Sequence, residues 1–293
     1  MPKQIKLPLR RASRLSPAGM LCLLMTMLMT CGAAQAAGIS ERILAGIEKA
    51  AATPDATLIG GGITYEPAYD GSRSSKIGAV PIISYTGHNL FVRTTEGILE
   101  GGVRAELLDG LHIGLQLAYE EGRQTSDSDF LKRHNFQTLD ASASYGAFLQ
   151  YEADLGPVPI DLLARYRKDV DSDNGSQFDL SATVGVYGGD DKPLNIEVYA
   201  QTTWADTRSL QSFYGVTAAQ AATSGLAAYT PGSGWLNNQV GIYVAYNLSP
   251  QWLLIGNAEE HQLLGDARNS PLTEVRYNHT VTLGIGYLFG ATK

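Results

Sequence analysis

The sequence contains very little cysteine, and none in the part expected to remain after export. Its two cysteines are Cys22 and Cys31, and both precede the cleavage site predicted below. Without a thiol, the mature chain can form neither a disulfide nor a cysteine metal site. Disulfide frameworks and cysteine-based zinc sites are therefore excluded for the mature protein.

Long apolar runs and an excess of positive charge are also missing. No later segment has 18 consecutive apolar residues, so the sequence predicts no membrane-spanning helix. The whole chain has 22 basic and 29 acidic residues, and loss of the five basic residues before residue 37 leaves 17 basic residues and a net charge of −12. A phosphate backbone would repel such a chain, which argues against a nucleic-acid partner.

The N-terminus carries the parts of a secretory signal peptide. Five basic residues precede a short apolar stretch at 20–30, and Ala34-Gln35-Ala36 forms an A-x-A cleavage pattern. Residues 1–36 are therefore predicted to be a signal peptide that is removed on export. Residues 37–56 would then form a periplasmic leader, either a short helix over 39–52 or a segment without regular structure.

From Thr57 onward the dominant period is two. In the last such segment Val281, Leu283 and Ile285 share one face, while Thr280 and Thr282 share the other. Such alternation predicts half-apolar β-strands. Strands are expected near 57–68, 76–86, 89–95, 97–107, 110–120, 137–153, 158–168, 176–188, 192–204, 236–248, 251–263 and 274–289. Alternation is typical of a membrane barrel, but a soluble sandwich alternates as well.

The lengths of the connections separate these two folds. Every second connection is short, as at 87–88, 108–109, 155–157, 189–191 and 249–250, whereas most of the others are longer, as at 69–75, 121–136, 205–235 and 264–273. An even number of strands with short turns at one end and long loops at the other is typical of outer-membrane barrels. The predicted fold of 57–293 is thus all-β: a transmembrane, antiparallel, up-and-down β-barrel of 12 strands, with short periplasmic turns and longer extracellular loops.

Aromatic residues near the strand ends support this prediction. Rings with a polar tip suit the headgroup level of a bilayer. The last strand also carries Thr282, Gly284, Tyr287 and Phe289 in a spacing that resembles the signal by which outer-membrane barrels are recognised for assembly. The sequence therefore predicts a protein of a Gram-negative outer membrane, whose partners include lipid, lipopolysaccharide and the barrel-assembly machinery.

The same alternation predicts which polar side chains face the lumen. The residues expected to face inward are Glu100, Arg104, Glu106, Gln116, Glu120, Asp140, Gln150, Glu152, Asp161, Arg165, Arg167, Asp179, Glu197 and Arg276. A barrel of this size lies between those filled by side chains and those with a channel. The mixed charges could close the lumen through ion pairs or line a narrow pore. In segment 251–263 the alternation does not identify the inward face. Trp252 and Leu254 make one face apolar, and Leu253 and Ile255 make the other face apolar as well.

No pattern in the sequence indicates catalysis. The five histidines lie in no recognisable zinc or nucleophile motif. The acidic loop 169–175 lacks the glutamate that would close a calcium site, since Leu180 occupies that position. No catalytic residue, metal site or cofactor site is predicted, and the chain is not expected to be an enzyme.

Three ordered motifs resemble the MipA/OmpV family of outer-membrane proteins. They are Gly60-Gly61-Gly62 with 65–72, the 213–229 part of the long loop, and Leu264-Gly265-Asp266-Ala267 with Ser270-Pro271. The resemblance implies a scaffold that joins a murein-degrading lytic transglycosylase to a murein synthase. Members are also described as porin-like or adhesin-like, so a small-solute channel and a surface adhesin or antimicrobial-responsive protein stay open as alternatives. The loop 205–235, with a two-turn helix expected at 217–225, would carry the last of these.

Overall fold

The computed structural model describes residues 57–87, 89–95, 98–189 and 192–289. The predicted signal peptide and the leader 37–56 lie outside the described residues, and both stay predictions. Among the described residues, no helix is both long and apolar enough to cross a membrane.

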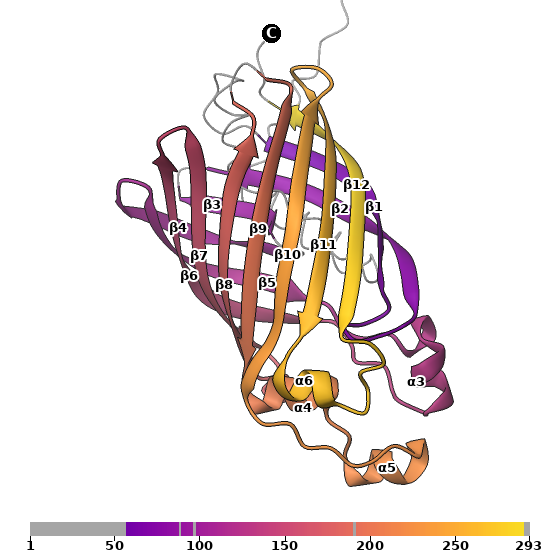
Figure 1. Cartoon of the computed structure of the whole chain (residues 1–293). Helices are drawn as coiled ribbons and strands as arrows, with labels where there is room; N and C mark the ends of the chain where they lie inside the picture. The colour runs from indigo at the N-terminus through magenta and orange to yellow at the C-terminus, as the bar shows by residue number, and fades with distance from the viewer. Residues whose placement is uncertain (1–56, 88, 96–97, 190–191, 290–293) are drawn as a thin grey trace, which may run out of the picture. The chain divides into compact units, whose positions relative to one another are not determined.

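Antiparallel strands build a closed barrel in the described part of the chain (Figure 1). Each strand pairs with its neighbours in sequence, and β1 pairs with β12 to close the ring. The strands are β1 (Thr57–Pro67), β2 (Ser75–Thr86), β3 (Leu90–Thr95), β4 (Ile98–Leu108), β5 (Leu111–Glu120), β6 (Ser142–Leu155), β7 (Val158–Asp169), β8 (Ser176–Tyr187), β9 (Leu194–Ala205), β10 (Gly234–Asn247), β11 (Trp252–Leu263) and β12 (Tyr277–Phe289). The predicted 12-stranded, up-and-down barrel is confirmed.

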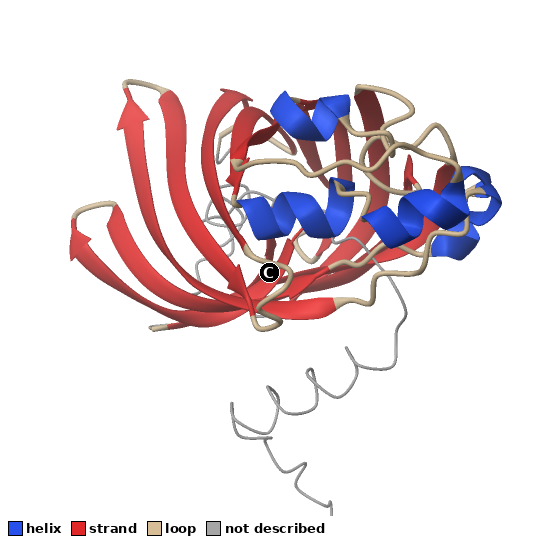
Figure 2. Cartoon of the chain, turned by 90° about the horizontal axis from the view of Figure 1, so that it is seen from below, coloured by secondary structure: helices blue, strands red, loops and turns tan. Residues whose placement is uncertain are grey.

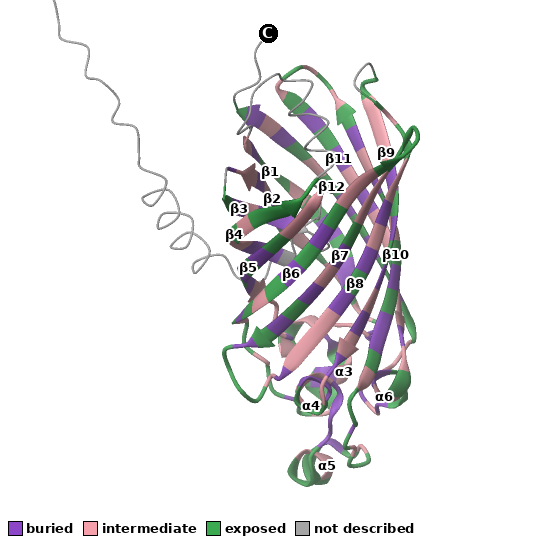
Figure 3. Ribbon diagram, turned by 90° about the vertical axis from the view of Figure 1, so that its left-hand side faces the viewer, coloured by how far each residue is buried: buried purple, intermediate pink, exposed green. Residues whose placement is uncertain are grey.

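The alternating residues take the opposite places from those in a soluble protein (Figure 3). In β12, Thr280 and Thr282 are buried, whereas Val281, Leu283 and Ile285 are exposed on the outer surface. The other strands also expose apolar side chains on the outside, and most buried polar side chains lie inside, together with a smaller set of apolar ones. A wall that faces acyl chains requires this arrangement, and a soluble sandwich would reverse it.

The closing pair β1–β12 contains glycines in direct register. Gly60 lies opposite Gly286, and Gly62 lies opposite Gly284. A Cβ atom on Gly60 would collide with the backbone of Ile285 in β12. The two strands can therefore approach this closely only because these side chains are missing.

The two ends of the barrel differ in how the strands are connected. Short turns join the strands at one end, and the helices lie in the longer loops at the other end (Figure 2). The helical segments are η1 (Thr125–Asp127), α3 (Asp129–Arg133), α4 (Thr207–Tyr214), α5 (Ala218–Ser224) and α6 (Gly265–Asn269). The predicted helix at 217–225 is confirmed as α5, which begins after a capping box formed by Thr217 and Gln220 and ends at Gly225 with φ 74°.

Three details differ from the sequence prediction or complete it. β6 begins at Ser142 and β12 at Tyr277, later than expected, because the preceding residues belong to the loops. The inward face of β11 carries Leu253 and Ile255, which are buried, while Trp252 and Leu254 are exposed. Leu253 and Ile255 belong to an apolar cluster inside the barrel, with Leu58, Val80, Ile82, Tyr199, Tyr243, Ala245 and Leu288.

Candidate functional site

A chain of buried ion pairs lies in the lumen on the side of β3 to β8. Arg93 Nε lies 2.7 Å from Glu100 Oε1, and the other oxygen of Glu100 lies 3.3 Å from Arg165 Nη1. Arg165 Nε in turn lies 2.9 Å from Asp179 Oδ2. The side chains of these four residues are at most 2% exposed. Since Glu100 is on β4 and Arg165 is on β7, the chain joins strands that are not neighbours in the wall.

Arg167 extends this chain toward the long-loop end. Its Nε lies 3.1 Å from Asp179 Oδ2, and its Nη1 donates to Glu120 Oε2 at 2.6 Å. Its Nη2 donates to Gln177 Oε1 at 2.9 Å, and Thr203 donates its hydroxyl proton to Asp179 Oδ1 at 3.0 Å. Buried charges are tolerated only when they are paired and hydrogen-bonded, and these groups meet that condition.

The structure brings together most of the residues expected in the lumen. Glu100, Glu120, Arg165, Arg167 and Asp179 form the chain described above. Beside it, Gln150 donates to Asp161 at 2.6 Å and accepts from Arg93 Nη1 at 3.1 Å. Glu197 and Gln116 are buried, and Arg104 and Glu152 are partly buried.

Three residues expected in the lumen are exposed rather than buried. Asp140 and Arg276 are exposed in the loops before β6 and β12, because both strands begin later than the alternation suggested. Glu106 is exposed near the end of β4, where its carboxylate accepts a hydrogen bond of 3.3 Å from Gly110 N–H in the adjoining turn.

Arg93 and Glu259 were missed by the sequence analysis, although both lie in the lumen. Arg93 is 1% exposed, and its guanidinium lies over the rings of Phe91 and Phe148 at 4.8 and 5.2 Å. β3 is too short to establish a clear alternation. In β11 both faces are apolar at first, so parity did not place Glu259 inside.

Glu259 is the centre of a second polar group, on the opposite side of the lumen. Its carboxylate accepts hydrogen bonds from the Tyr199 hydroxyl and, at 2.8 Å, from Gln239 Nε2. His261 Nε2 lies 3.1 Å from Glu259 Oε1, and His261 Nδ1 lies 3.7 Å from Asp70 Oδ1. Asn257 also donates to the Tyr199 hydroxyl, at 3.2 Å.

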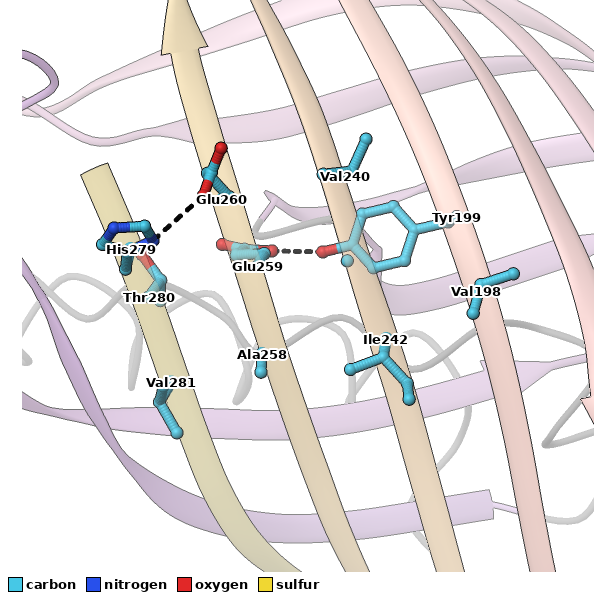
Figure 4. Close-up of a pocket in the computed structure, with 11 residues that line it drawn as sticks. Val198, Tyr199, Val240, Ile242, Ala258, Glu259, Glu260, His279, Thr280 and Val281 are labelled. Carbon is cyan, nitrogen blue, oxygen red and sulfur yellow. Dashed lines mark hydrogen bonds and ion pairs between the residues drawn. The ribbon is translucent and has the colours of Figure 1, made fainter. Parts of the chain in front are cut away.

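A shallow depression of about 530 Å³ opens on the outer wall across β9 to β12 (Figure 4). Val198, Val240 and Val281 line it with exposed apolar side chains. His279 Nδ1 and Glu260 Oε2 lie 3.5 Å apart at its edge, on paired positions of β12 and β11. In the described chain no group of three or more His, Cys, Asp or Glu residues could hold a metal ion.

The long loops form a lid, defined here as residues 68–74, 121–141, 206–233 and 264–276. Arg123 Nη1 donates to Phe213 O at 2.6 Å, and Tyr69 donates its hydroxyl proton to Leu272 O at 2.9 Å. Burial lowers the pKa of the Arg123 guanidinium and raises that of the Tyr69 hydroxyl. Ser270 Oγ donates to Tyr214 O at 2.6 Å and links these two pairs of loops, so the lid folds as one layer.

The predicted assembly-signal residues lie on both faces of β12. Thr282 faces inward, where its Oγ1 lies 3.0 Å from Thr64 Oγ1, and Gly284 belongs to the closing pair. Tyr287 contacts the rings of Trp252 and Phe289 at centroid distances of 5.0 and 4.8 Å. These outward rings form part of an aromatic belt at the short-turn end. Recognition by the assembly machinery stays a prediction.

Comparisons with known proteins found relatives of this chain. MltA-interacting protein of Escherichia coli (strain K12) is 25% identical over 215 residues, which cover 72% of this chain and 81% of the relative. Putative outer membrane protein YiaT of Escherichia coli O157:H7 is 22% identical over 241 residues, covering 82% and 94%. Among solved structures, the NanC porin has a TM-score of 0.40 at 8% identity, covering 79% of this chain and 98% of the porin.

The protein therefore lies in the outer membrane of a Gram-negative bacterium. The profile of the family described as "MltA-interacting protein MipA" matches residues 59–289. Because this match spans nearly the whole barrel, from β1 to the last residue of β12, the chain belongs to the MipA family.

Proposed function

We propose that this protein is a scaffold fixed in the outer membrane, which joins a murein-degrading lytic transglycosylase to a murein synthase. The observation that carries the proposal is the packed interior. The ion-pair chain around Arg165 and the apolar cluster around Leu58 occupy opposite sides of the lumen, and each joins strands that are not neighbours. Contacts that join non-neighbouring strands favour a rigid wall for docking over a passage for solutes.

The surface for these enzymes would be the short-turn end together with the leader 37–56. Apolar side chains project from its turns: Leu108 is 68% exposed, Leu155 65% and Leu248 54%. Exposed apolar side chains at the ends of the strands, as at Leu108 and Leu155, or just past them, as at Leu248, are suited to protein contacts. The acidic Asp109 and Asp154 lie beside them and would favour a basic partner surface.

Capture of purified enzymes tests the scaffold role. Full-length protein in detergent should retain a purified lytic transglycosylase, and the double variant Leu108→Ser/Leu155→Ser should retain about tenfold less. Leu115→Ser is the matched control, because Leu115 is 62% exposed in the middle of β5 and should face lipid. Equal capture by all three proteins, or by none, contradicts the proposal. Deletion of residues 39–52 measures how much the leader contributes to capture of the enzyme.

The channel is the alternative that the polar lumen suggests, and planar-bilayer recording separates it from the scaffold. If the buried side chains close the lumen, as the scaffold proposal requires, purified protein should give no conductance steps. Steps that persist at defined amplitude would support a channel instead. Steps that appear only in Arg165→Ala would show that the ion-pair chain blocks a path through the barrel.

A further inference from the structure

In the described part of the chain, the wall is incomplete on one side of β2. Along its whole length β2 pairs with β1, but β3 pairs only with Ser84, Tyr85 and Thr86 of this strand (Figure 1). At Ile83 the Thr94 hydroxyl takes the place of the backbone, at 3.5 Å from Ile83 N and 3.4 Å from Ile83 O. Within the described chain, no strand residue pairs with 75–82 on this side.

Among the described residues, this edge of β2 has backbone groups without a partner strand. Because these groups alternate in direction, Ile77, Ala79 and Pro81 direct theirs to the same side as Ile83. Pro81 has no N–H to leave unpaired, which suits a strand edge. Ala79 lies opposite Ile63, and Ile63 lies opposite Leu283, so the edge is level with the apolar outer band. Unpaired backbone groups are tolerated at that depth only where they are buried in protein or line a cavity.

Behind this edge, three carboxylates surround one ammonium group. Lys76 Nζ lies 3.0 Å from Glu121 Oε1, 3.4 Å from Glu66 Oε1 and 3.7 Å from Asp127 Oδ2. Glu66 is 1% exposed. A second oxygen of Glu66 and one of Glu121 are buried without a hydrogen-bond partner in the described structure.

The Glu66 carboxylate lies close to the backbone of β2 at Gly78. A Cβ atom on Gly78 would lie 3.6 Å from Glu66 Oε1, so the carboxylate rests against the inner face of β2 at this glycine. Three carboxylates with a single Lys76 leave room for a further positive charge, and the two unpartnered oxygens could accept its hydrogen bonds. Outside, Ile77 is 77% exposed and offers an apolar surface beside the same edge.

We propose that the open edge of β2 is a lateral binding site for an amphiphile with a long alkyl chain and a primary ammonium head. The head enters beside Ala79 and binds Glu66 and Glu121. The alkyl chain stays in the bilayer against Ile77 and Ala79. The ligand would reach this site from the lipid phase of the membrane and not from the aqueous phase.

Photolabelling tests the site in the full-length protein. The protein is placed in phosphatidylcholine nanodiscs with dodecylammonium that carries a diazirine at its chain end, and adducts are mapped by peptide mass spectrometry. Adducts should concentrate in 75–83 and on the strands next to the opening. Glu66→Gln and Glu121→Gln should each lower the adduct yield about tenfold, as expected for loss of a charged hydrogen-bond partner.

Matched controls separate this site from general partitioning into lipid. Glu106→Gln removes an exposed carboxylate at the other end of the barrel and should leave the yield unchanged. Chain-matched dodecyl sulfate carrying the same diazirine should not label 75–83, and butylammonium should not compete with dodecylammonium. Adducts spread evenly around the wall, or equal labelling by dodecyl sulfate, would overturn the proposal.

Lys76→Gln tests the site through an expected gain of labelling, which a damaged protein would not produce. It removes the internal ammonium that competes for the same carboxylates, so labelling by dodecylammonium should increase several-fold. A structural role for Lys76 alone predicts no change or a loss. Heat-modifiable migration on gels confirms that each variant is folded before it is labelled. Unchanged labelling in a folded Lys76→Gln protein would contradict the proposed competition.

Discussion

Replacement of Arg165 by methionine tests whether the buried ion pairs hold the wall together. Arg165 is 0% exposed and contacts Glu100 at 3.3 Å and Asp179 at 2.9 Å. Methionine keeps much of the side-chain volume but removes the charge. Two buried carboxylates then lose a partner, and they cannot recover its contribution from water.

The expected loss of stability depends on the ion-pair partners that Glu100 and Asp179 keep. Removal of one member of a buried pair typically costs about 3–5 kcal/mol. Glu100 keeps Arg93 at 2.7 Å, and Asp179 keeps Arg167 at 3.1 Å. We therefore expect Arg165→Met to lower the free energy of unfolding by about 3 kcal/mol, the lower end of that range.

Urea unfolding in phospholipid vesicles, followed by tryptophan fluorescence, measures this change. Glu106→Gln is the matched surface control and should stay within about 0.5 kcal/mol of the wild type. The double variant Arg165→Met/Asp179→Asn removes the carboxylate that is left in excess, because Arg167 keeps Glu120 as its partner at 2.6 Å, and should recover about 1 kcal/mol. A single variant as stable as the control, or a double variant less stable than Arg165→Met, would refute the reasoning.

The remaining predictions concern the lid and the closing strands. Asp206→Ala removes the N-cap of α4, in which Asp206 Oδ1 accepts from Ser209 N at 2.8 Å, and should cost about 1 kcal/mol, seen as faster proteolysis within the lid. Burial alone would raise the pKa of Asp206, but hydrogen bonds from Ser209 and Ser176 hold it below the ordinary value. Its contribution should therefore be complete at pH 7 and decline as the pH falls below about 4, in the same proteolysis assay. Gly60→Val should prevent β1 and β12 from pairing and abolish heat-modifiable migration on gels. Gly61→Val should preserve that migration, because the nearest atom to its Cβ would be Val80 O at 3.7 Å.

Period-two alternation made much of the barrel predictable from the sequence. Once a segment is a strand, parity assigns each side chain to a face, and this places Arg165, Arg167 and Asp179 in the lumen. Loop lengths then separated a barrel from a sandwich. Parity is uninformative where both faces are apolar, as at Leu253 and Ile255, because neither alternative exposes a polar residue there.

The pairing of charges could not be predicted in the same way. Whether Glu100 contacts Arg93, Arg165 or both depends on strand stagger and on the curvature of the whole wall, which no local pattern records. The lid is less predictable still. Its contacts, such as Arg123 to Phe213 O, join loops of irregular backbone that are distant in sequence.

The pairing of β1 with β12 also imposes an order of events during biogenesis. Every other strand pair joins neighbours along the chain, but this pair joins the first strand to the last. Bringing such distant segments together carries the largest loop-closure entropy in the molecule. Until β12 has been made, the free edge of β1 is available to the wrong partners, including β1 of another chain. A polypeptide that ends before β12 therefore cannot close the barrel.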